Sequence, residues 1–259
     1  MKIRYFHVDA FTHQAFRGNP AGVAALESWL PDETLQLMAR EHGLPETAFF
    51  VKRGGLFDLR WYTPESEVDL CGHATLATAH VILNHLEPGR DGVEFQTKSG
   101  LLTVIREGQL LEMNFPSRPG EKIAIEAGIK EALGVTPLEL YKSRDLMAVV
   151  ESEDTVRNIV PNFEAIKKLD CLGVVVTAPS KKADFVSRFF APSVGVPEDP
   201  VTGSAHCTLV PYWSQRLKKT KLHALQLSER GGELFCEHKN GRVTLGGRAV
   251  TYFEAVIQL

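Results

Sequence analysis

The chain has 259 residues, of which 44% are hydrophobic, enough to form a core in one large or two medium domains. Its formal net charge of −3 and its pI near 6.3 give no electrostatic footprint for nucleic acid or for an anionic membrane surface. The N-terminus lacks the apolar core of a signal peptide, and no run of about 18 apolar residues occurs. We therefore expect a soluble, cytoplasmic protein without nucleic-acid or membrane partners.

The first half of the chain alternates strand and helix signals. The predicted strands span residues 3–8, 22–26, 47–52, 56–62, 93–97, 101–106 and 110–115, and the predicted helices span 31–41 and 73–85. The second of these helices is apolar on nearly every side, which is typical of a helix that is buried all round. A sheet must therefore wrap it.

The second half repeats this plan. Helices are predicted at 124–133, at 162–169 and after Gly203, and strands at 138–141, 146–151, 172–177, 184–190, 224–228, 233–237, 242–245 and 252–258. A spacing of 128 residues separates Phe57 from Phe185, 131 separates Gly72 from Gly203, and 130 separates Gln96 from Gln226. These nearly constant spacings indicate a duplication. We expect an α/β fold of two homologous halves, residues 1–117 and 118–259, with the strand at 252–258 crossing back to complete the first sheet.

Two helices open on a glycine, in Cys71-Gly72-His73 and in Gly203-Ser204. Each follows a peptide composed of arginine, two aromatic residues, a small residue and proline. The first N–H groups of a helix have no intrahelical acceptor, so each helix start can hold an anion such as a carboxylate. Two such starts in a duplicated chain predict one shared cleft for a small carboxylate.

Glu46 is the clearest catalytic candidate because it occurs in one half alone. It directly precedes an apolar strand, and the equivalent position in the second half falls at Gly173 or Val174. A carboxylate at the end of a buried strand and facing a cleft can act as a general base near neutral pH. The same pattern also suits a solvent-facing glutamate after a helix-ending turn.

Two further polar residues have both functional and structural interpretations. His73 lies in the first turn of its helix, where the helix dipole disfavours a positive charge, so we expect a neutral imidazole that either positions a substrate or caps local backbone. Asp199 precedes a proline, which suits a turn-forming aspartate as well as a binding residue. The remaining histidines lack metal-ligand spacing, and no Gly-rich nucleotide motif or nucleophile elbow occurs.

Four phrases of the chain resemble one known family. Residues 16–21 (Phe-Arg-Gly-Asn-Pro-Ala), 45–49 (Pro-Glu-Thr-Ala-Phe), 70–75 (Leu-Cys-Gly-His-Ala-Thr) and 198–206 (Glu-Asp-Pro-Val-Thr-Gly-Ser-Ala-His) are similar to those of the PhzF-like isomerases, and especially of the phenazine biosynthesis-like domain-containing proteins. The phrases occur in the family's order and spacing over the whole chain. The resemblance implies the diaminopimelate epimerase fold, in which each half wraps a curved mixed sheet round a central helix.

The same resemblance implies the roles of individual residues. Glu46 becomes the acid/base that moves a proton between two carbons, and His73 and Asp199 become polar partners of the substrate. The other implied substrate-binding residues, Gly72, Gly203 and Ser204, lie at the carboxylate through the helix N-termini. No metal or organic cofactor is implied, and the implied partners are a small carboxylate substrate and, in a homodimer, a second copy of the chain.

One position departs from the two-thiol racemases of this fold. Those enzymes have a cysteine before each helix-opening glycine, whereas here Cys71 is matched by Thr202. A threonine hydroxyl does not ionise near neutral pH, so a one-base proton shift by Glu46 is favoured over two-thiol racemisation. Cys71 is then either an auxiliary acid or a small residue that packs behind the helix start.

The sequence leaves two hypotheses of different classes. One is a cofactor-independent isomerase that acts on a small carboxylate-bearing metabolite through Glu46. The other is a catalytically lapsed member of the same fold that binds a metabolite or a protein. Retention of Glu46, His73, Asp199 and Ser204 at the family's spacing favours the isomerase.

Overall fold

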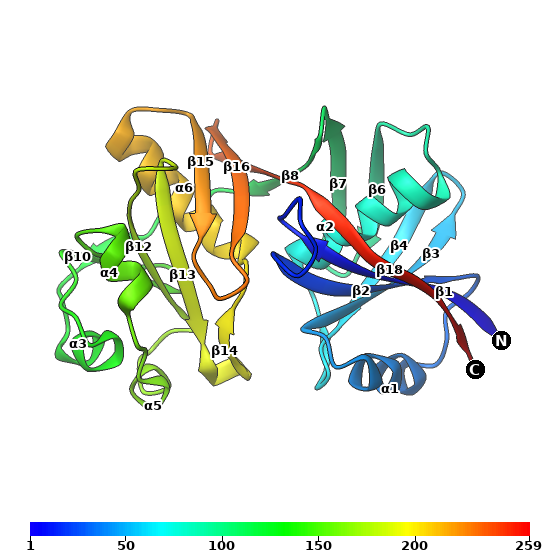
Figure 1. Cartoon of the computed structure of the whole chain (residues 1–259), viewed down its shortest axis with the longest axis horizontal. Helices are drawn as coiled ribbons and strands as arrows, with labels where there is room; N and C mark the ends of the chain where they lie inside the picture. The colour runs from blue at the N-terminus through cyan, green and yellow to red at the C-terminus, as the bar shows by residue number, and fades with distance from the viewer. The chain divides into compact units, whose positions relative to one another are not determined.

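The strands of the chain form two units, which are seen in the computed structural model of residues 1–259 (Figure 1). Unit 1 comprises Met1–Asn114 and Gly246–Leu259, and unit 2 comprises Phe115–Leu245. The expected boundary after residue 117 lies close to this division, but the last 14 residues belong to unit 1. They do so because β18 (Ala249–Gln258) pairs antiparallel with β1 (Lys2–Ala10), so that the two chain ends lie side by side (Figure 1).

Unit 1 contains one mixed sheet and a buried helix. Its further elements are β2 (Asn19–Leu26), α1 (Asp32–His42), β3 (Glu46–Arg53), β4 (Leu56–Tyr62), β5 (Glu67–Val68), α2 (Gly72–Val81), the π-helical turn η1 (Ile82–Leu86), β6 (Gly92–Thr97), β7 (Gly100–Glu107) and β8 (Leu110–Pro116). The strand order is β18-β1-β2-β3-β4-β6-β7, with β5 also on β4 and β8 on β7. Two pairings are parallel, β2 with β3 and β4 with β6, and helices make the crossovers.

Helix α2 lies at the centre of unit 1. Its residues from His73 to Ala79 are all buried, and it packs against β1, β2, β3 and β18. A helix without a polar face has no stable position at a surface, so the sheet curves around it. The predicted helix 73–85 is therefore present, but its last turn widens to the π-helical form at Ile82.

Unit 2 repeats the arrangement. Its elements are β9 (Glu121–Ile123), α3 (Ala127–Leu133), β10 (Glu139–Lys142), β11 (Leu146–Val149), α4 (Glu153–Asn158), α5 (Phe163–Ile166), β12 (Val174–Pro179), β13 (Phe185–Ala191), the short helix η2 (Pro192–Val194), β14 (Val196–Asp199), α6 (Gly203–Leu217), β15 (Lys221–Gln226), β16 (Gly232–Lys239) and β17 (Arg242–Gly247). The strand order is β9-β10-β11-β12-β13-β15-β16, with β14 also on β13. Parallel and antiparallel pairings follow one another as in unit 1.

The strand registers identify equivalent residues in the two units. Thr47 pairs with Tyr62, and Val174 pairs with Phe190, so Glu46 corresponds to Gly173. Phe57 pairs with Phe95, and Phe185 pairs with Ala224. The predicted match of Gln96 with Gln226 is therefore wrong by one residue. It rested on the shared residue type, whereas the strand registers align Gln226 with Thr97.

Helix α6 is interrupted in its middle by Pro211. Proline has no N–H, so the carbonyl of Cys207, four residues earlier, loses its helical partner. The backbone N–H of Arg118 donates to that carbonyl at 2.9 Å instead. The segment before β9 thus supplies the hydrogen bond that the proline removes from the helix.

Several short elements of both units were not predicted from the sequence. Helix α4 has only six residues, but Ser152 caps it, because its hydroxyl accepts from the N–H of Thr155 at 3.1 Å. β5, β9 and β14 have two to four residues each, too few to show alternation. No helix of the chain is long and apolar enough to cross a membrane.

Candidate active site

Local structure at the end of α1 places Glu46 at the start of β3. Gly43 ends the helix in the left-handed conformation, with φ of 62°, and its N–H donates to the carbonyl of Ala39. The chain then enters β3 with Glu46 as the first residue, paired in parallel with Ala21 of β2. The Glu46 side chain is 19% exposed, so its position at the first residue of the strand leaves its carboxylate reachable from outside.

The start of α2 brings two more reactive groups to this carboxylate. Nε2 of His73 lies 3.2 Å from Oε2 of Glu46, and Sγ of Cys71 lies 3.5 Å from Nδ1 of the same imidazole. Cys71 is the residue before the helix, and His73 lies in its first turn. Both are buried, with exposures of 7% and 6%. A carboxylate, an imidazole and a thiol therefore form one cluster in unit 1.

The charge of this cluster follows from its burial. Burial lowers the pKa of His73, but Cys71 and the Glu46 carboxylate outweigh it, and the pKa lies well above its ordinary value. Burial, reinforced by Glu46, raises the pKa of the Cys71 thiol. The Glu46 carboxylate, 3.2 Å from Nε2, favours the charged form of the His73 imidazole.

The expectation of a neutral His73 is therefore wrong. It weighed only the helix dipole, which disfavours a cation at a helix N-terminus by about 0.3–1 kcal/mol. A carboxylate at 3.2 Å from a buried imidazole is a stronger and opposite influence. The structure thus pairs an imidazolium with the carboxylate that sequence reasoning selected as the base.

Both glycine-opened helices begin without a side-chain cap. Neither Cys71 before α2 nor Thr202 before α6 makes a capping hydrogen bond. A Cβ on Gly72 would meet no atom within 4 Å, and a Cβ on Gly203 would meet only Leu245, at an ordinary 3.6 Å. Packing therefore requires glycine at neither position, whereas open space beside uncapped N–H groups suits an approaching anion.

In unit 2, Asp199 belongs to a hydrogen-bonded network at the end of β14. The hydroxyl of Thr202 donates to Oδ2 of Asp199 at 2.6 Å. The buried amide of Gln226 donates to the carbonyl of Asp199 at 2.8 Å, and its oxygen accepts from the N–H of Thr202 at 2.9 Å. Thr202, the counterpart of Cys71, is thus a fixed hydrogen-bonding residue with no thiol chemistry.

Ser204 has a cationic neighbour that the sequence did not reveal. Nη2 of Arg144 donates to Oγ of Ser204 at 2.9 Å and lies 3.0 Å from Oδ2 of Asp145. Arg144 comes from the turn between β10 and β11, 60 residues before Ser204. No motif marks that turn, so only the fold could bring its guanidinium to the start of α6. Arg144 and Gln226 are the polar residues that sequence reasoning missed.

The predicted residues thus form two groups. Glu46, Gly72 and His73 lie together in unit 1, and Asp199, Gly203 and Ser204 lie at the start of α6 in unit 2. The expectation that both groups bind one carboxylate stays a prediction.

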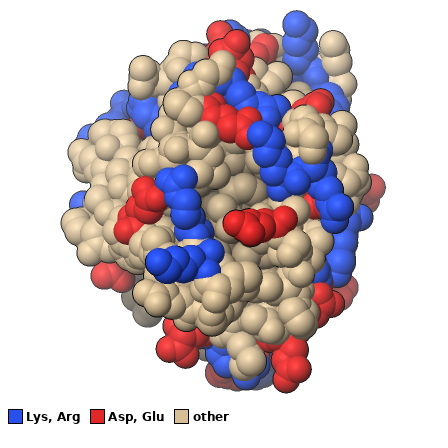
Figure 2. Space-filling model, turned by 90° about the vertical axis from the view of Figure 1, so that its right-hand side faces the viewer, with Lys and Arg blue, Asp and Glu red and all other residues tan.

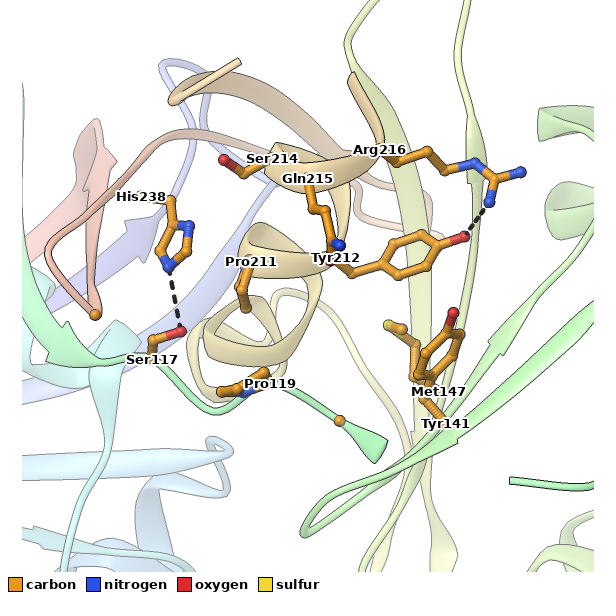
Figure 3. Close-up of a pocket in the computed structure, with 12 residues that line it drawn as sticks. Ser117, Pro119, Tyr141, Met147, Pro211, Tyr212, Ser214, Gln215, Arg216 and His238 are labelled. Carbon is orange, nitrogen blue, oxygen red and sulfur yellow. Dashed lines mark hydrogen bonds between the residues drawn. The ribbon is translucent and has the colours of Figure 1, made fainter. Parts of the chain in front are cut away.

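A pocket of unit 2 lies elsewhere, along the C-terminal half of α6 (Figure 3). It has a volume of about 800 Å³, and none of the predicted residues lines it. Tyr141, Tyr212 and Arg216 on one side all donate to Glu139, at 2.8, 3.2 and 2.7 Å. Burial opposes the ionised carboxyl, but Lys122, Tyr141 and Arg216 lower the pKa of Glu139 to about 2. These polar groups meet one another's hydrogen-bonding requirements. The cluster of Glu46, Cys71 and His73 in unit 1 is therefore the better candidate for a catalytic site.

Charged side chains on the surface of unit 1 are largely paired. Nη2 of Arg4 lies 2.6 Å from Glu254, and Nζ of Lys98 lies 2.5 Å from Glu67. Figure 2 shows basic and acidic side chains interspersed among uncharged ones on the face that it presents. That face therefore carries no extended field of one sign.

Comparisons with known proteins bear on the family and the fold. The family model described as phenazine biosynthesis-like protein, PhzC-PhzF, matches residues 8–255. An uncharacterized isomerase of Pseudomonas aeruginosa is 49% identical over 259 residues, covering 100% of both chains. The crystal structure of a PhzF-family protein from Enterococcus faecalis is 46% identical, with a TM-score of 0.98 over 100% of both chains.

A more distant likeness concerns the fold alone. A hydroxyproline epimerase from Agrobacterium vitis, solved with trans-4-hydroxy-L-proline, is 11% identical, with a TM-score of 0.64 over 99% of this chain and 92% of that one. The predicted fold of two epimerase-like halves is thereby confirmed.

Proposed function

This chain belongs to the phenazine biosynthesis-like (PhzC-PhzF) family and is an isomerase, and we propose that it moves a proton between carbons of a small carboxylate-bearing metabolite with Glu46 as the acid/base. The observation that carries this proposal is the position of the Glu46 carboxylate. It is partly exposed, and it lies 3.2 Å from a buried imidazole whose pKa is raised. A base needs access to its substrate and a defined orientation, and Glu46 has both.

The proposed reaction uses one carboxylate for both proton transfers. Glu46 takes a proton from a carbon next to the substrate carboxylate, and the electron pair of the broken C–H bond moves into an enolate-like system. The protonated Glu46 then returns the proton to another carbon of that system, so no net charge or electron is gained. His73 donates to Glu46 throughout and holds its orientation.

Stabilisation of the enolate-like charge is assigned to the uncapped helix starts. Their N–H groups are fixed by the helices before the reaction, so no reorganisation is needed when negative charge develops. Arg144 beside Ser204 adds a guanidinium, which suits a carboxylate geometrically. We propose that these groups select substrates with a carboxylate and that no organic cofactor takes part.

A two-base mechanism with opposed thiols is disfavoured by the second unit. The counterpart of Cys71 is Thr202, whose hydroxyl is committed to Asp199 at 2.6 Å. The counterpart of Glu46 is Gly173, where a Cβ would lie 2.5 Å from Cζ of Phe189. Unit 2 thus offers neither a thiol nor space for a carboxylate at the equivalent positions.

Solvent deuterium exchange tests the proposal without knowledge of the physiological substrate. The purified chain is incubated in D₂O with a panel of small amino and hydroxy carboxylates, and proton NMR follows loss of carbon-bound proton signals. We expect time-dependent exchange of at least one compound, which Glu46→Gln abolishes. Exchange that is equally fast in the Glu46→Gln variant would remove Glu46 from the mechanism. A wild-type chain that binds a panel member yet exchanges none of them would favour a catalytically lapsed binding protein.

A further inference from the structure

The cluster in unit 1 combines the three side-chain types that bind transition metals. Glu46, Cys71 and His73 each offer a ligand atom, and these atoms all lie within 4.8 Å of one another. It is the one group of three or more histidine, cysteine, aspartate or glutamate residues with this property in the chain. Such a grouping is unrelated to sequence spacing, because Glu46 comes from β3 and the other two from the start of α2.

The separations match those of a shared ion. With metal–ligand bonds of about 2.0–2.3 Å, a tetrahedral zinc site places oxygen and nitrogen about 3.3 Å apart and sulfur and nitrogen about 3.6 Å apart. Here Oε2 of Glu46 lies 3.2 Å from Nε2 of His73. Sγ of Cys71 lies 4.0 Å from this same Nε2, the ring nitrogen that would share an ion with Glu46. The ligand atoms of Glu46 and Cys71 lie within 4.8 Å of one another, so binding requires this pair to close to about 3.6 Å.

The chemistry of the three ligands defines the class of ion. Thiolate and imidazole ligands suit zinc and its neighbours in the transition series, whereas magnesium and calcium prefer oxygen ligands. On binding the ion, the Cys71 thiol and the His73 imidazolium each release a proton to solvent. The Glu46 carboxylate and the resulting thiolate together carry two negative charges, which balance a divalent ion in a site where Cys71 and His73 are less than 8% exposed. The partly exposed Glu46 provides the side from which the ion enters.

We propose that Glu46, Cys71 and His73 bind a thiophilic divalent metal ion such as Zn²⁺, with water as the fourth ligand, and that the bound ion inhibits the enzyme. Inhibition rests on the proposed function, because an ion bound to Glu46 removes the base. Binding itself does not depend on that function. The ion is thus an inhibitor that competes for the catalytic carboxylate.

Cobalt(II) titration of the whole metal-free chain tests the binding. Tetrahedral Co²⁺ absorbs strongly in the visible range, and a thiolate ligand adds a charge-transfer band in the near ultraviolet. We expect both signals in the wild type, reversed by Zn²⁺ and unchanged by Mg²⁺. Cys71→Ser should lose the charge-transfer band and weaken binding by at least about 10-fold, since loss of even an indirect metal contact costs about 10–100-fold.

Matched controls separate this site from other thiols. Cys171→Ser changes the half-buried cysteine of unit 2, which belongs to no such cluster, and should retain the full spectrum. Glu46→Gln should weaken binding while keeping the charge-transfer band, because Cys71 remains. Circular dichroism verifies that each variant is folded. Absence of the bands in the wild type, or their persistence in Cys71→Ser, would overturn the proposal.

The deuterium-exchange assay provides a second readout that is distinct from binding. Zn²⁺ should abolish exchange by the wild type and by Cys171→Ser, and a chelator should restore it. Wild-type exchange that continues when the cobalt spectrum shows a filled site contradicts inhibition. If Co²⁺ binds as expected but no panel compound exchanges, the proposed function fails and the metal site stands.

Discussion

Replacement of Glu46 by glutamine isolates the charge of the proposed base from its shape. The amide has nearly the volume of the carboxylate, and its oxygen can still accept from Nε2 of His73, which lies 3.2 Å from Glu46 in the native chain. It has no basic oxygen to take a carbon-bound proton. The variant should therefore fold and bind substrate, yet fail in the proton-transfer step.

Glu46→Gln should lower the exchange rate strongly and the free energy of unfolding only slightly. General acid–base catalysis contributes about 10²–10⁴-fold, which corresponds to roughly 2.7–5.5 kcal/mol of activation free energy. Loss of the charge in a hydrogen-bonded pair costs less than about 3 kcal/mol of unfolding free energy, because the hydrogen bond itself survives. Exchange should thus fall by at least about 100-fold in a chain that remains folded.

The assay compares deuterium incorporation by four proteins under one condition. Glu41→Gln is the matched control, because it makes the same change at an exposed residue of α1, five positions earlier. It should exchange at the wild-type rate. Cys71→Ala should lose less activity than Glu46→Gln, because Thr202 offers no second thiol. The reverse order, with exchange surviving in Glu46→Gln and vanishing in Cys71→Ala, would refute the one-carboxylate mechanism in favour of thiol chemistry.

Three other predictions address the remaining parts of the structure. Because the pKa of His73 is raised in the folded chain, its protonation stabilises the fold fully below the ordinary pKa near 6.5, and this stabilisation is lost as pH rises through the folded-state pKa. Urea unfolding from pH 6 to 9.5 should show a falling free energy of unfolding in the wild type and a flatter pH profile in Glu46→Gln. Gly173→Ala should destabilise the chain by about 1–3 kcal/mol through overpacking against Phe189, whereas Gly55→Ala, which meets no atom within 4 Å, should not; equal melting temperatures would contradict the clash. Ser204→Ala should raise the KM of a carboxylate substrate about fivefold, or about 1 kcal/mol, and an unchanged KM would remove Ser204 from substrate binding.

Sequence reasoning found the elements whose causes are local. Strand alternation, the glycine stop after α1 and the all-apolar face of α2 depend on neighbouring residues, so those elements were predictable to within a few positions. The state of His73 was not, because it depends on a carboxylate 27 residues away in the chain and 3.2 Å away in space. Arg144 was missed for the same reason. No motif marks its turn, and its guanidinium meets Ser204, 60 residues later in the chain, only when the chain is folded.

The duplication supports the proposal that one carboxylate is the base. Two copies of one unit begin with the same strand order and the same uncapped helix start, so their differences show what each copy has lost or gained. At the position of Glu46, unit 2 has Gly173, and the ring of Phe189 occupies the space of a side chain there. A base could not be restored to that position without removing the ring from the core. The packing of unit 2 therefore leaves no room for a second carboxylate at this position, which favours the proposed proton shift on one face of the substrate over an inversion that needs two bases.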